Sequence, residues 1–315
     1  MSADRSEKPA VSSDPAFLPA LQEGRRQFLA LVDAVRPELH RYCARMTGSV
    51  VDGEDVVQDT LARAYYELAD LRELPALRAW LFRIAHNRAV DLLRARQLRT
   101  SEPLEAALEV AAADELDPEN ALAREQAVHA ALSRFLEIAP AQRSCVILKD
   151  VLGHSLEEIA ALLELSLPAV KAALHRGRAR LRELSAAAQP RLVQSTVSPA
   201  TARYAALFNA RDWDGVRAML VDDVKLDVPS KIKRAGRGPV GSYFTNYDKL
   251  ADWYLVPAWV EGREAIAVFR DPTHPQPGYF IELTLRGQQV AAIRDFRYVP
   301  YIARDAVIVL AADRP

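Results

Sequence analysis

The sequence predicts a multidomain protein in which two all-α helical domains precede one α+β domain. Apolar residues recur at helical spacing as far as about residue 188, and short strand-like runs prevail after residue 199. Between the two helical parts, residues 97–123 are acidic, rich in Ala and Glu, and lack apolar periodicity. With 315 residues, 50% of them hydrophobic, the chain is long enough for about two to three domains.

Composition also limits the compartment and the partners. The polar N-terminus lacks the apolar segment of a secretory signal, and no stretch of the sequence is apolar enough to span a membrane. Cys43 and Cys145 lie far apart and outside any metal-binding spacing, which favours the reducing cytoplasm and predicts no metal site. Because the net charge is only −1, affinity for nucleic acid has to come from local basic patches.

In the first helical part, an apolar stripe begins near Gln27, and we expect Pro37 to open a second helix that Gly48 ends. Asp52 is then predicted to be the N-cap of the next helix. The outer face of that helix is left with Asp55, Gln58, Asp59, Ala62 and Arg63. From composition alone, this face is an ordinary solvated surface.

A loop at 70–77 leads to a long helix over 78–96, whose core side carries apolar residues such as Trp80 and Ile84. Its other side presents polar residues at spacings of three and four: Arg83, Asn87, Arg88, Asp91 and Arg94. Arginines at such positions contact phosphates and an asparagine pairs with a base edge, which favours a DNA-binding helix. The alternative is a solvated helix surface.

The second helical part ends in a helix-turn-helix pattern. Ser155 and Glu158 form a capping box that opens a short amphipathic helix, and Ser166 caps a longer one with Pro168 in its first turn. The apolar line of the longer helix includes Gly177. Its remaining surface is strongly basic, with Lys171, His175, Arg176, Arg178, Arg180 and Arg182 against the single acid Glu183. This excess of positive charge favours a helix that binds a polyanion by entering the major groove of DNA, rather than a solvated helix of a bundle.

These motifs, in this order, resemble the extracytoplasmic-function group of the sigma-70 family. Residues 27–96 resemble region 2 and residues 127–184 resemble region 4. The segments that carry the resemblance are DGEDVVQDTLARAY (52–65), AWLFRIAHNRAVDLLR (79–94), IAPAQRSCVILKDVLGHSLEEIAALLELS (138–166) and PAVKAALHRGRARLRE (168–183).

The resemblance implies core RNA polymerase and promoter DNA as partners. It implies polymerase contacts at Asp55, Gln58, Asp59 and Arg63, and recognition of the −10 element by the loop 70–77 and by Arg83, Asn87, Arg88, Asp91 and Arg94. Recognition of the −35 element would fall to Ser166, Pro168, Ala169, Lys171, Ala172, His175, Arg176 and Arg178. Because each basic helix alone makes few phosphate contacts, we expect weak DNA binding by the free protein.

After a linker, the C-terminal part begins with helices at 200–209 and 213–220. Strands follow at 224–228, 258–260 and 265–269, and the chain then forms a hairpin of 279–285 with 290–298. This layout resembles the SnoaL-like branch of the NTF2-like cone fold, which implies a curved antiparallel sheet. The predicted domains are a disordered leader at 1–24, region 2 at 25–96, a flexible linker at 97–123, region 4 at 124–188, a linker at 189–198 and the cone at 199–311.

Cones of this type sometimes hold acid–base pairs, and the available groups here are Asp222, Asp223, Asp227, His274 and Asp295. Tyr243, Trp253, Tyr254 and Trp259 are candidates to line a cavity. No convincing pair emerges, so we predict no enzyme activity, no catalytic residue and no cofactor. We predict instead a cone that regulates the sigma domains in cis, with an anti-sigma factor or a small ligand as a candidate partner.

Two alternatives remain open at this point. One is an ordinary helix-turn-helix regulator with a ligand-sensing cone, which leaves residues 52–96 unexplained. The other is a DNA-tethered SnoaL-like enzyme, which requires the missing acid–base pair. Deletion of 194–315 is expected to change transcription or polymerase affinity if the cone regulates.

Overall fold

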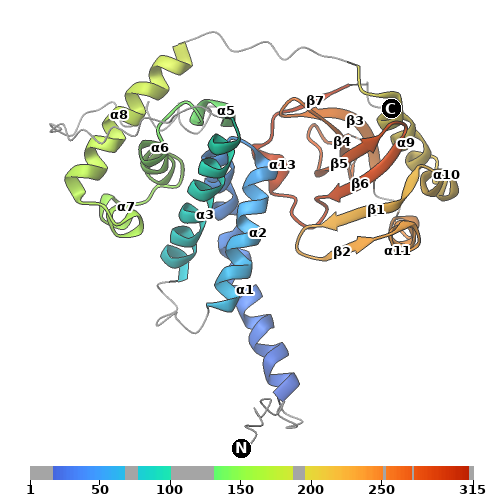
Figure 1. The fold of residues 1–315 in the computed structure, drawn as a ribbon, viewed down its shortest axis with the longest axis horizontal. Coiled ribbons are helices and arrows are strands. Elements are labelled where there is room, and N and C mark those ends of the chain that lie inside the picture. The colour runs from blue at the N-terminus through green and yellow to red at the C-terminus, as the bar shows by residue number, and fades with distance from the viewer. Residues whose placement is uncertain are drawn as a thin grey trace, which may run out of the picture.

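The computed structural model describes residues 17–67, 77–100, 131–186, 196–250, 253–271 and 273–311. Figure 1 shows three parts: a central helical unit (α1–α3), a second helical unit on one side (α5–α8), and a sheet domain on the other side, here called the cone (α9–β7). The predicted order of two helical parts and one α+β part is therefore observed.

The first helical unit consists of α1 (Phe17–Thr47), α2 (Val50–Tyr66) and α3 (Leu77–Thr100). The expectation that Pro37 opens a new helix is wrong, because α1 runs through it. A proline inside a helix removes one backbone hydrogen bond without ending the helix when tertiary packing supports both sides. The leader predicted at 1–24 is corrected too, since α1 already begins at Phe17.

The predicted N-cap of α2 is also corrected. Ser49 caps the helix and its side chain accepts a hydrogen bond from the Asp52 amide, so Asp52 lies in the first turn. Gly48 has φ +73° and ends α1 as predicted, which leaves only one residue before α2 begins. The predicted loop at 70–77 lies largely outside the described residues, which resume with Leu77 in α3.

The second helical unit contains α5 (Leu132–Phe135), α6 (Pro140–Val146), the π-helical turn η3 (Ile147–Val151), α7 (Leu156–Leu163) and α8 (Leu167–Ala186). The capping box at Ser155 and the Ser166 cap of α8 are both confirmed. A Cβ at Gly177 would lie 2.7 Å from Val146 Cγ2, so glycine lets α8 pack directly on α6. Most of the predicted linker at 97–123 lies outside the described residues, although α3 continues to Thr100.

The cone opens with α9 (Pro199–Asn209) and α10 (Trp213–Ala218) and closes with α13 (Ile302–Asp305) and β7. Its strands are β1 (Leu220–Val228), β2 (Ile232–Ala235), β3 (Tyr254–Val260), β4 (Arg263–Phe269), β5 (Tyr279–Arg286), β6 (Gln289–Asp295) and β7 (Ile308–Leu310). Short helical turns, α11 (Arg237–Gly241), η4 (Ser242–Phe244) and α12 (Thr245–Asp248), fill the gap between β2 and β3.

The seven strands form one sheet in the order β2-β1-β6-β5-β4-β3-β7. The predicted hairpin of β5 and β6 is confirmed, with Gly287 at φ +64° in its turn. The sheet is mixed rather than purely antiparallel, because β1 pairs with β6 in parallel. The strands β2 and β7 were not predicted; both are short edge strands with weak patterns.

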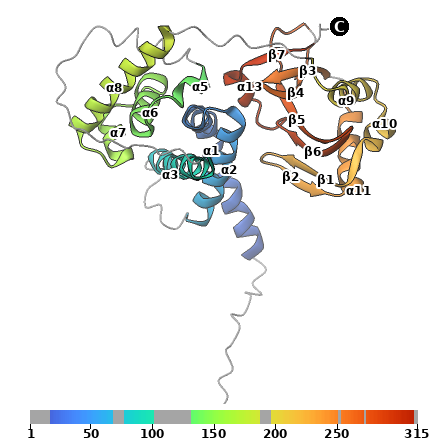
Figure 2. The same ribbon diagram turned by 45° about the horizontal axis from the view of Figure 1, so that its top comes forward.

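Packing joins the three parts into one body. A continuous apolar cluster runs through both helical units, from Phe28 in α1 to Leu184 in α8. Helices α9 and α10 cover one face of the sheet, and its opposite face turns toward α1 and α2 (Figure 2). The apolar cluster at this contact consists of Ala44, Val50, Val51, Leu132, Val260, Ala265, Phe280, Phe296, Val299 and Ile302.

Candidate functional site

The exposed face predicted on α2 is engaged by the chain itself. The carboxylate of Asp55 accepts two hydrogen bonds from the Arg294 guanidinium on β6. Asp59 pairs with Arg88 of α3 at 2.6 Å, and the Gln58 amide donates to Glu54 at 2.7 Å. Arg63 also forms a local pair, with Glu67. Asp55 therefore faces the cone, whereas Asp59 and Arg63 stay exposed on the part of α2 beyond it.

Glu54 is a central residue of this contact that sequence reasoning missed. Its side chain is fully buried, and nothing in the sequence assigned it either to the outer face of the helix or to the core. The Arg36 guanidinium of α1 donates to Glu54 Oε1 at 2.6 Å, and the Tyr301 hydroxyl of the cone donates to Oε2 at 2.8 Å. Burial raises the pKa of Tyr301, which keeps its hydroxyl protonated as a donor. A buried charge is tolerated only when it is paired in this way.

A second contact caps α2 from the cone. Glu261 lies in the two-residue turn between β3 and β4, where both Glu261 and Gly262 have positive φ, as hairpin turns of this type require. Its carboxylate oxygens each accept from the Val50 amide at 3.1 Å, at the N-terminus of α2. Burial raises the pKa of Glu261 to about 7. The Glu-Gly pair between two apolar runs indicates a turn, but nothing in the sequence indicates that the Glu261 carboxylate bonds the amide of Val50.

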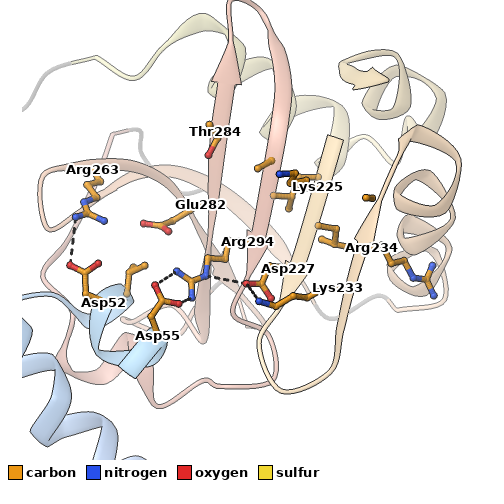
Figure 3. Close-up of a pocket in the computed structure, with 15 residues that line it drawn as sticks. Asp52, Asp55, Lys225, Asp227, Lys233, Arg234, Arg263, Glu282, Thr284 and Arg294 are labelled. Carbon is orange, nitrogen blue, oxygen red and sulfur yellow. Dashed lines mark hydrogen bonds and ion pairs between the residues drawn. The ribbon is translucent and has the colours of Figure 1, made fainter. Parts of the chain in front are cut away.

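Beside these contacts, a cleft of about 700 Å³ separates the N-terminal half of α2 from the outer face of the sheet (Figure 3). Asp52 and Asp55 lie on the α2 side, and Arg263, Glu282 and Arg294 lie on the sheet side. Asp52 approaches Arg263 at 3.8 Å and pairs with Arg96 of α3 at 2.8 Å. The charged lining distinguishes this cleft from the mostly apolar pockets that bind typical small molecules.

The predicted DNA-facing residues of α3 lie on its outer side. Arg83, Asn87, Asp91 and Arg94 are exposed, whereas Arg88 is half-buried by its pair with Asp59. Arg83 approaches Glu164 at the C-terminus of α7 at 3.9 Å, so the basic side of α3 borders the second helical unit.

The predicted DNA-facing residues of α8 divide into two groups. Ser166, Pro168, Lys171 and His175 are exposed, and Ala169 and Arg176 are half-buried. Ala172 is buried, and Arg178 donates to the buried carboxylate of Asp150 at 2.6 and 2.9 Å. Arg178 therefore stabilises the packing of α8 on η3, which the regular spacing of basic residues did not indicate.

Hydrogen bonds without a carboxylate partner hold the second helical unit against the first. The Tyr42 hydroxyl of α1 lies 2.8 Å from His86 Nδ1 of α3 and 2.6 Å from Ser144 Oγ of α6. The Arg143 guanidinium donates to main-chain carbonyls at Leu136 and Ile138 and also to that of Met46 in α1. Burial lowers the pKa of both His86 and Arg143.

The acid–base candidates of the cone do not converge. Asp222 and Asp223 are exposed and pair with Arg237 and Arg286, and His274 is exposed in its loop. Asp227 points to the outer face, where it approaches Lys233 at 3.6 Å. Asp295 is buried in the interior, apart from the other four acid–base candidates.

The interior of the cone is an aromatic core around Asp295. Its carboxylate accepts hydrogen bonds from the Tyr243 and Tyr247 hydroxyls, and Tyr279 lies 3.1 Å from Tyr247. Burial raises the pKa of Asp295. Tyr243 and Trp253, proposed from the sequence as cavity-lining residues, are instead packed into this core, and Tyr254 packs in a separate cluster, because side chains alternate along β3. Trp259 is half-buried outside both clusters.

Metal-binding clusters and membrane-spanning helices are both absent from the described residues. These residues contain no group of three or more His, Cys, Asp or Glu side chains arranged to hold a metal ion. None of their helices combines the length and the apolar character that crossing a membrane requires.

The fold defines a helix-turn-helix protein with a second basic helical unit and an appended cone. The sigma-70 region 2 family matches residues 31–99 and the sigma-70 region 4 family matches residues 126–181. Among curated relatives, the ECF RNA polymerase sigma factor SigG of Mycobacterium tuberculosis is 32% identical over 234 residues, which cover 66% of this chain and 62% of SigG. SigM of the same organism is 30% identical over 173 residues, 55% of this chain and 84% of SigM.

The chain belongs to the extracytoplasmic-function sigma factors of the sigma-70 family. It spans about 62% of the length of SigG. The crystal structure of the extracytoplasmic-function sigma factor SigJ of M. tuberculosis is a more distant match, with 22% identity, a TM-score of 0.34, and coverage of 85% of this chain and 95% of SigJ.

Proposed function

We propose that this protein binds core RNA polymerase and directs it to promoters by recognising −10 and −35 elements, and that its cone regulates this activity in cis without catalysing a reaction. The proposed partners are core polymerase, promoter DNA and, for the cone, a small ligand or an anti-sigma protein. These partners place its action in the cytoplasm. The observation that carries the regulatory proposal is the pair between Arg294 of the cone and Asp55 on α2.

The proposed polymerase contacts are Asp55, Gln58, Asp59 and Arg63 on α2. A protein partner that uses Asp55 has to displace Arg294, because one carboxylate accepts a bidentate guanidinium from only one side. The cone also covers the N-terminus of the same helix through Glu261. The docked arrangement is therefore proposed to be the inactive state, and release of the cone is proposed to complete the polymerase-binding face.

The helical units must also separate on a promoter. The −10 residues of α3 (Arg83, Asn87, Arg88, Asp91 and Arg94) and the −35 residues of α8 (Ser166, Pro168, Ala169, Lys171, Ala172, His175, Arg176 and Arg178) belong to units that share one apolar cluster. Elements about 25 base pairs apart are separated by roughly 80 Å along a duplex. Arg83 of the −10 set lies 3.9 Å from Glu164, which is two positions before Ser166 of the −35 set, so the packed arrangement brings the two sets too close together to span both elements.

Run-off transcription with core polymerase and a genomic promoter pool tests the proposal. Arg294→Ala is expected to raise transcription severalfold over the unmodified chain, since it frees Asp55 and leaves the α2 face intact. Arg286→Ala is the matched control, because Arg286 is also a cone arginine paired with an aspartate but lies away from α2. Asp55→Asn also removes the pair with Arg294, yet it is expected to lower transcription because Asp55 itself contacts polymerase.

Each outcome has a distinct meaning. Specific transcripts with equal activity of Arg294→Ala and Arg286→Ala would support the sigma function and contradict the regulatory contact. No transcripts from any form, combined with tight binding of the free protein to duplex DNA, would favour an ordinary helix-turn-helix regulator.

A further inference from the structure

The cleft between α2 and the sheet has two different rows of side chains on its sheet wall. Strand pairing aligns Asp227, Arg294 and Glu282 in one row and Lys225, Ala292 and Thr284 in the next. The first row contains the arginine that pairs with Asp55. In the second row, the small Ala292 lies between Lys225 and Thr284, and this leaves room in the wall.

Most charges around the cleft already have partners. Asp52 pairs with Arg96 and approaches Arg263, Asp55 pairs with Arg294, and Asp227 pairs with Lys233. The Arg234 guanidinium turns away from the cleft toward Ser242 (Figure 3). Within the described part of the chain, Lys225 and Glu282 are the two lining charges for which no hydrogen bond or ion pair within 4 Å is found.

These two charges have opposite signs and belong to the same wall. Glu282 projects toward the space beside α2, and Lys225 lies across the wall on the side of Thr284 (Figure 3). Their strands are separated by one intervening strand and the two residues lie in adjacent rows, so their Cα atoms are roughly 12 Å apart. Burial raises the pKa of Glu282 although Arg294 and Arg263 act in the opposite direction, so a further cation beside the carboxylate would offset the remaining cost of its ionisation.

We propose that the cleft binds a small zwitterion of the α-amino acid class, with its ammonium group on Glu282 and its carboxylate on Lys225 and the Thr284 hydroxyl. A dianion would meet Glu282, Asp52 and Asp55, and a dication would meet Lys225 and Arg263, so only a molecule with both charges matches the wall. A volume of about 700 Å³ is ample for an amino acid, and sites at domain interfaces are common.

The ligand also has a defined effect on the domains. Val51, Asp52 and Asp55 of α2 complete the cleft opposite the sheet, so the site is whole only while the cone is docked. The three polar contacts belong to the sheet, but a ligand that fills the cleft also contacts the α2 surface around Val51, and by mass action this additional contact stabilises docking. This consequence rests on the proposed sigma function and would make the amino acid a co-repressor, whereas the binding itself does not depend on that function.

Isothermal titration of the full-length protein with each of the twenty common L-amino acids tests the site, with succinate as the dianion and 1,4-diaminobutane as the dication. At least one amino acid is expected to bind at least tenfold more tightly than either comparator. Lys225→Met and Glu282→Gln are each expected to weaken that binding tenfold or more. Lys231→Met, an exposed lysine of the β1–β2 turn outside the cleft, is the control and is expected to change it less than twofold.

A charge exchange keeps the test decisive if single variants lose stability. Lys225→Glu combined with Glu282→Lys presents the same charges in reverse and is expected to recover most of the affinity lost in either single variant. No binding of any amino acid, equal binding of succinate, or equal affinity of Lys225→Met and Lys231→Met would overturn the proposal. Transcription is a separate readout. Binding without an effect on transcription would support the binding site and contradict the co-repressor role.

Discussion

The first helical unit has two interfaces, one with the second helical unit and one with the cone, and they differ in chemistry. Toward the second unit, the contact is a shared apolar cluster with neutral hydrogen bonds such as that between Tyr42 and Ser144, and the Arg83–Glu164 pair at its edge is exposed to solvent. Toward the cone, an apolar patch is surrounded by charged contacts at Glu54, Asp55 and Glu261. Asp305 of α13 adds a further carboxylate near Arg41 and Arg45 of α1, at 3.6 and 3.5 Å.

This difference indicates that the two interfaces respond to different conditions. Apolar burial and neutral hydrogen bonds are insensitive to ionic strength, whereas exposed charge pairs weaken as salt screens them. Carboxylates with raised pKa values also couple docking of the cone to pH. The cone contact is therefore the one suited to regulation, and the contact between the helical units is released only when a competing surface replaces it.

The largest expected effect is at the buried charge of the cone interface. Glu54→Gln keeps the shape of the side chain but leaves the Arg36 guanidinium buried without its counter-ion. Removing one partner of a buried pair costs about 3 to 5 kcal/mol in the free energy of unfolding. Urea unfolding followed by circular dichroism measures this loss.

The matched control for this variant is Glu67→Gln. Glu67 pairs with Arg63 at 2.8 Å on the exposed end of the same helix, so its loss is expected to cost well under about 1 kcal/mol. Equal costs at the two positions would contradict a special role for the buried pair.

A smaller effect is expected from pH at the cap of α2. In the docked state the pKa of Glu261 is about 7, compared with an ordinary value of 4.5 after release. The docked state therefore retains a proton that the released state has lost. Docking is strongest below pH 4.5 and weakens as pH rises through 7, by about 3 to 4 kcal/mol in total at about 1.4 kcal/mol per pKa unit.

Energy transfer between dyes on cysteines introduced at Tyr66 and Gln288, both exposed, measures this docking. The titration is best made above pH 6.5, because burial lowers the pKa of His40 beside Tyr301, and His40 acts with the opposite sign when it gains a proton at lower pH. Glu261→Gln is expected to remove the dependence between pH 6.5 and 8. An unchanged slope in that variant would assign the dependence to Asp55 or Glu282, whose pKa values burial also raises.

The smallest effect is expected at the interface between the helical units. Tyr42→Phe removes the hydroxyl that bonds Ser144 and His86 and keeps the ring, so it is expected to cost about 1 kcal/mol. The cost is expected to be the same at about 0.05 and 0.5 M NaCl, because the Tyr42 hydroxyl bonds groups that are neutral in this contact. Tyr66→Phe, at a tyrosine that is 85% exposed, is the control for urea unfolding. A cost that falls steeply with salt would mean that this interface, too, depends on charge.

Local physics determined much of this fold from the sequence alone. The capping box at Ser155, the turn at Gly287 and the apolar line of α8 follow from contacts within a few residues, and these predictions are confirmed. The matches to sigma regions 2 and 4 also follow from the sequence, because each motif is a contiguous segment of it. The prediction that Pro37 opens a helix was wrong because long-range packing supports α1 on both sides of the proline. The prediction that Asp52 is the N-cap was wrong because Ser49 lies closer to the start of α2.

Only the tertiary structure decided which charges meet. Asp55 and Arg294 are 239 positions apart, and Glu54 and Tyr301 are 247 apart, so no periodicity connects them. On the sequence, Glu54 is indistinguishable from a solvated first-turn acid and Arg178 from a DNA-facing arginine, because burial depends on the neighbouring element and not on the residue itself. The sequence therefore determined the helices, the order of the domains and the family, while the docking of the cone on α2 arose from contacts that exist only once the whole chain is packed.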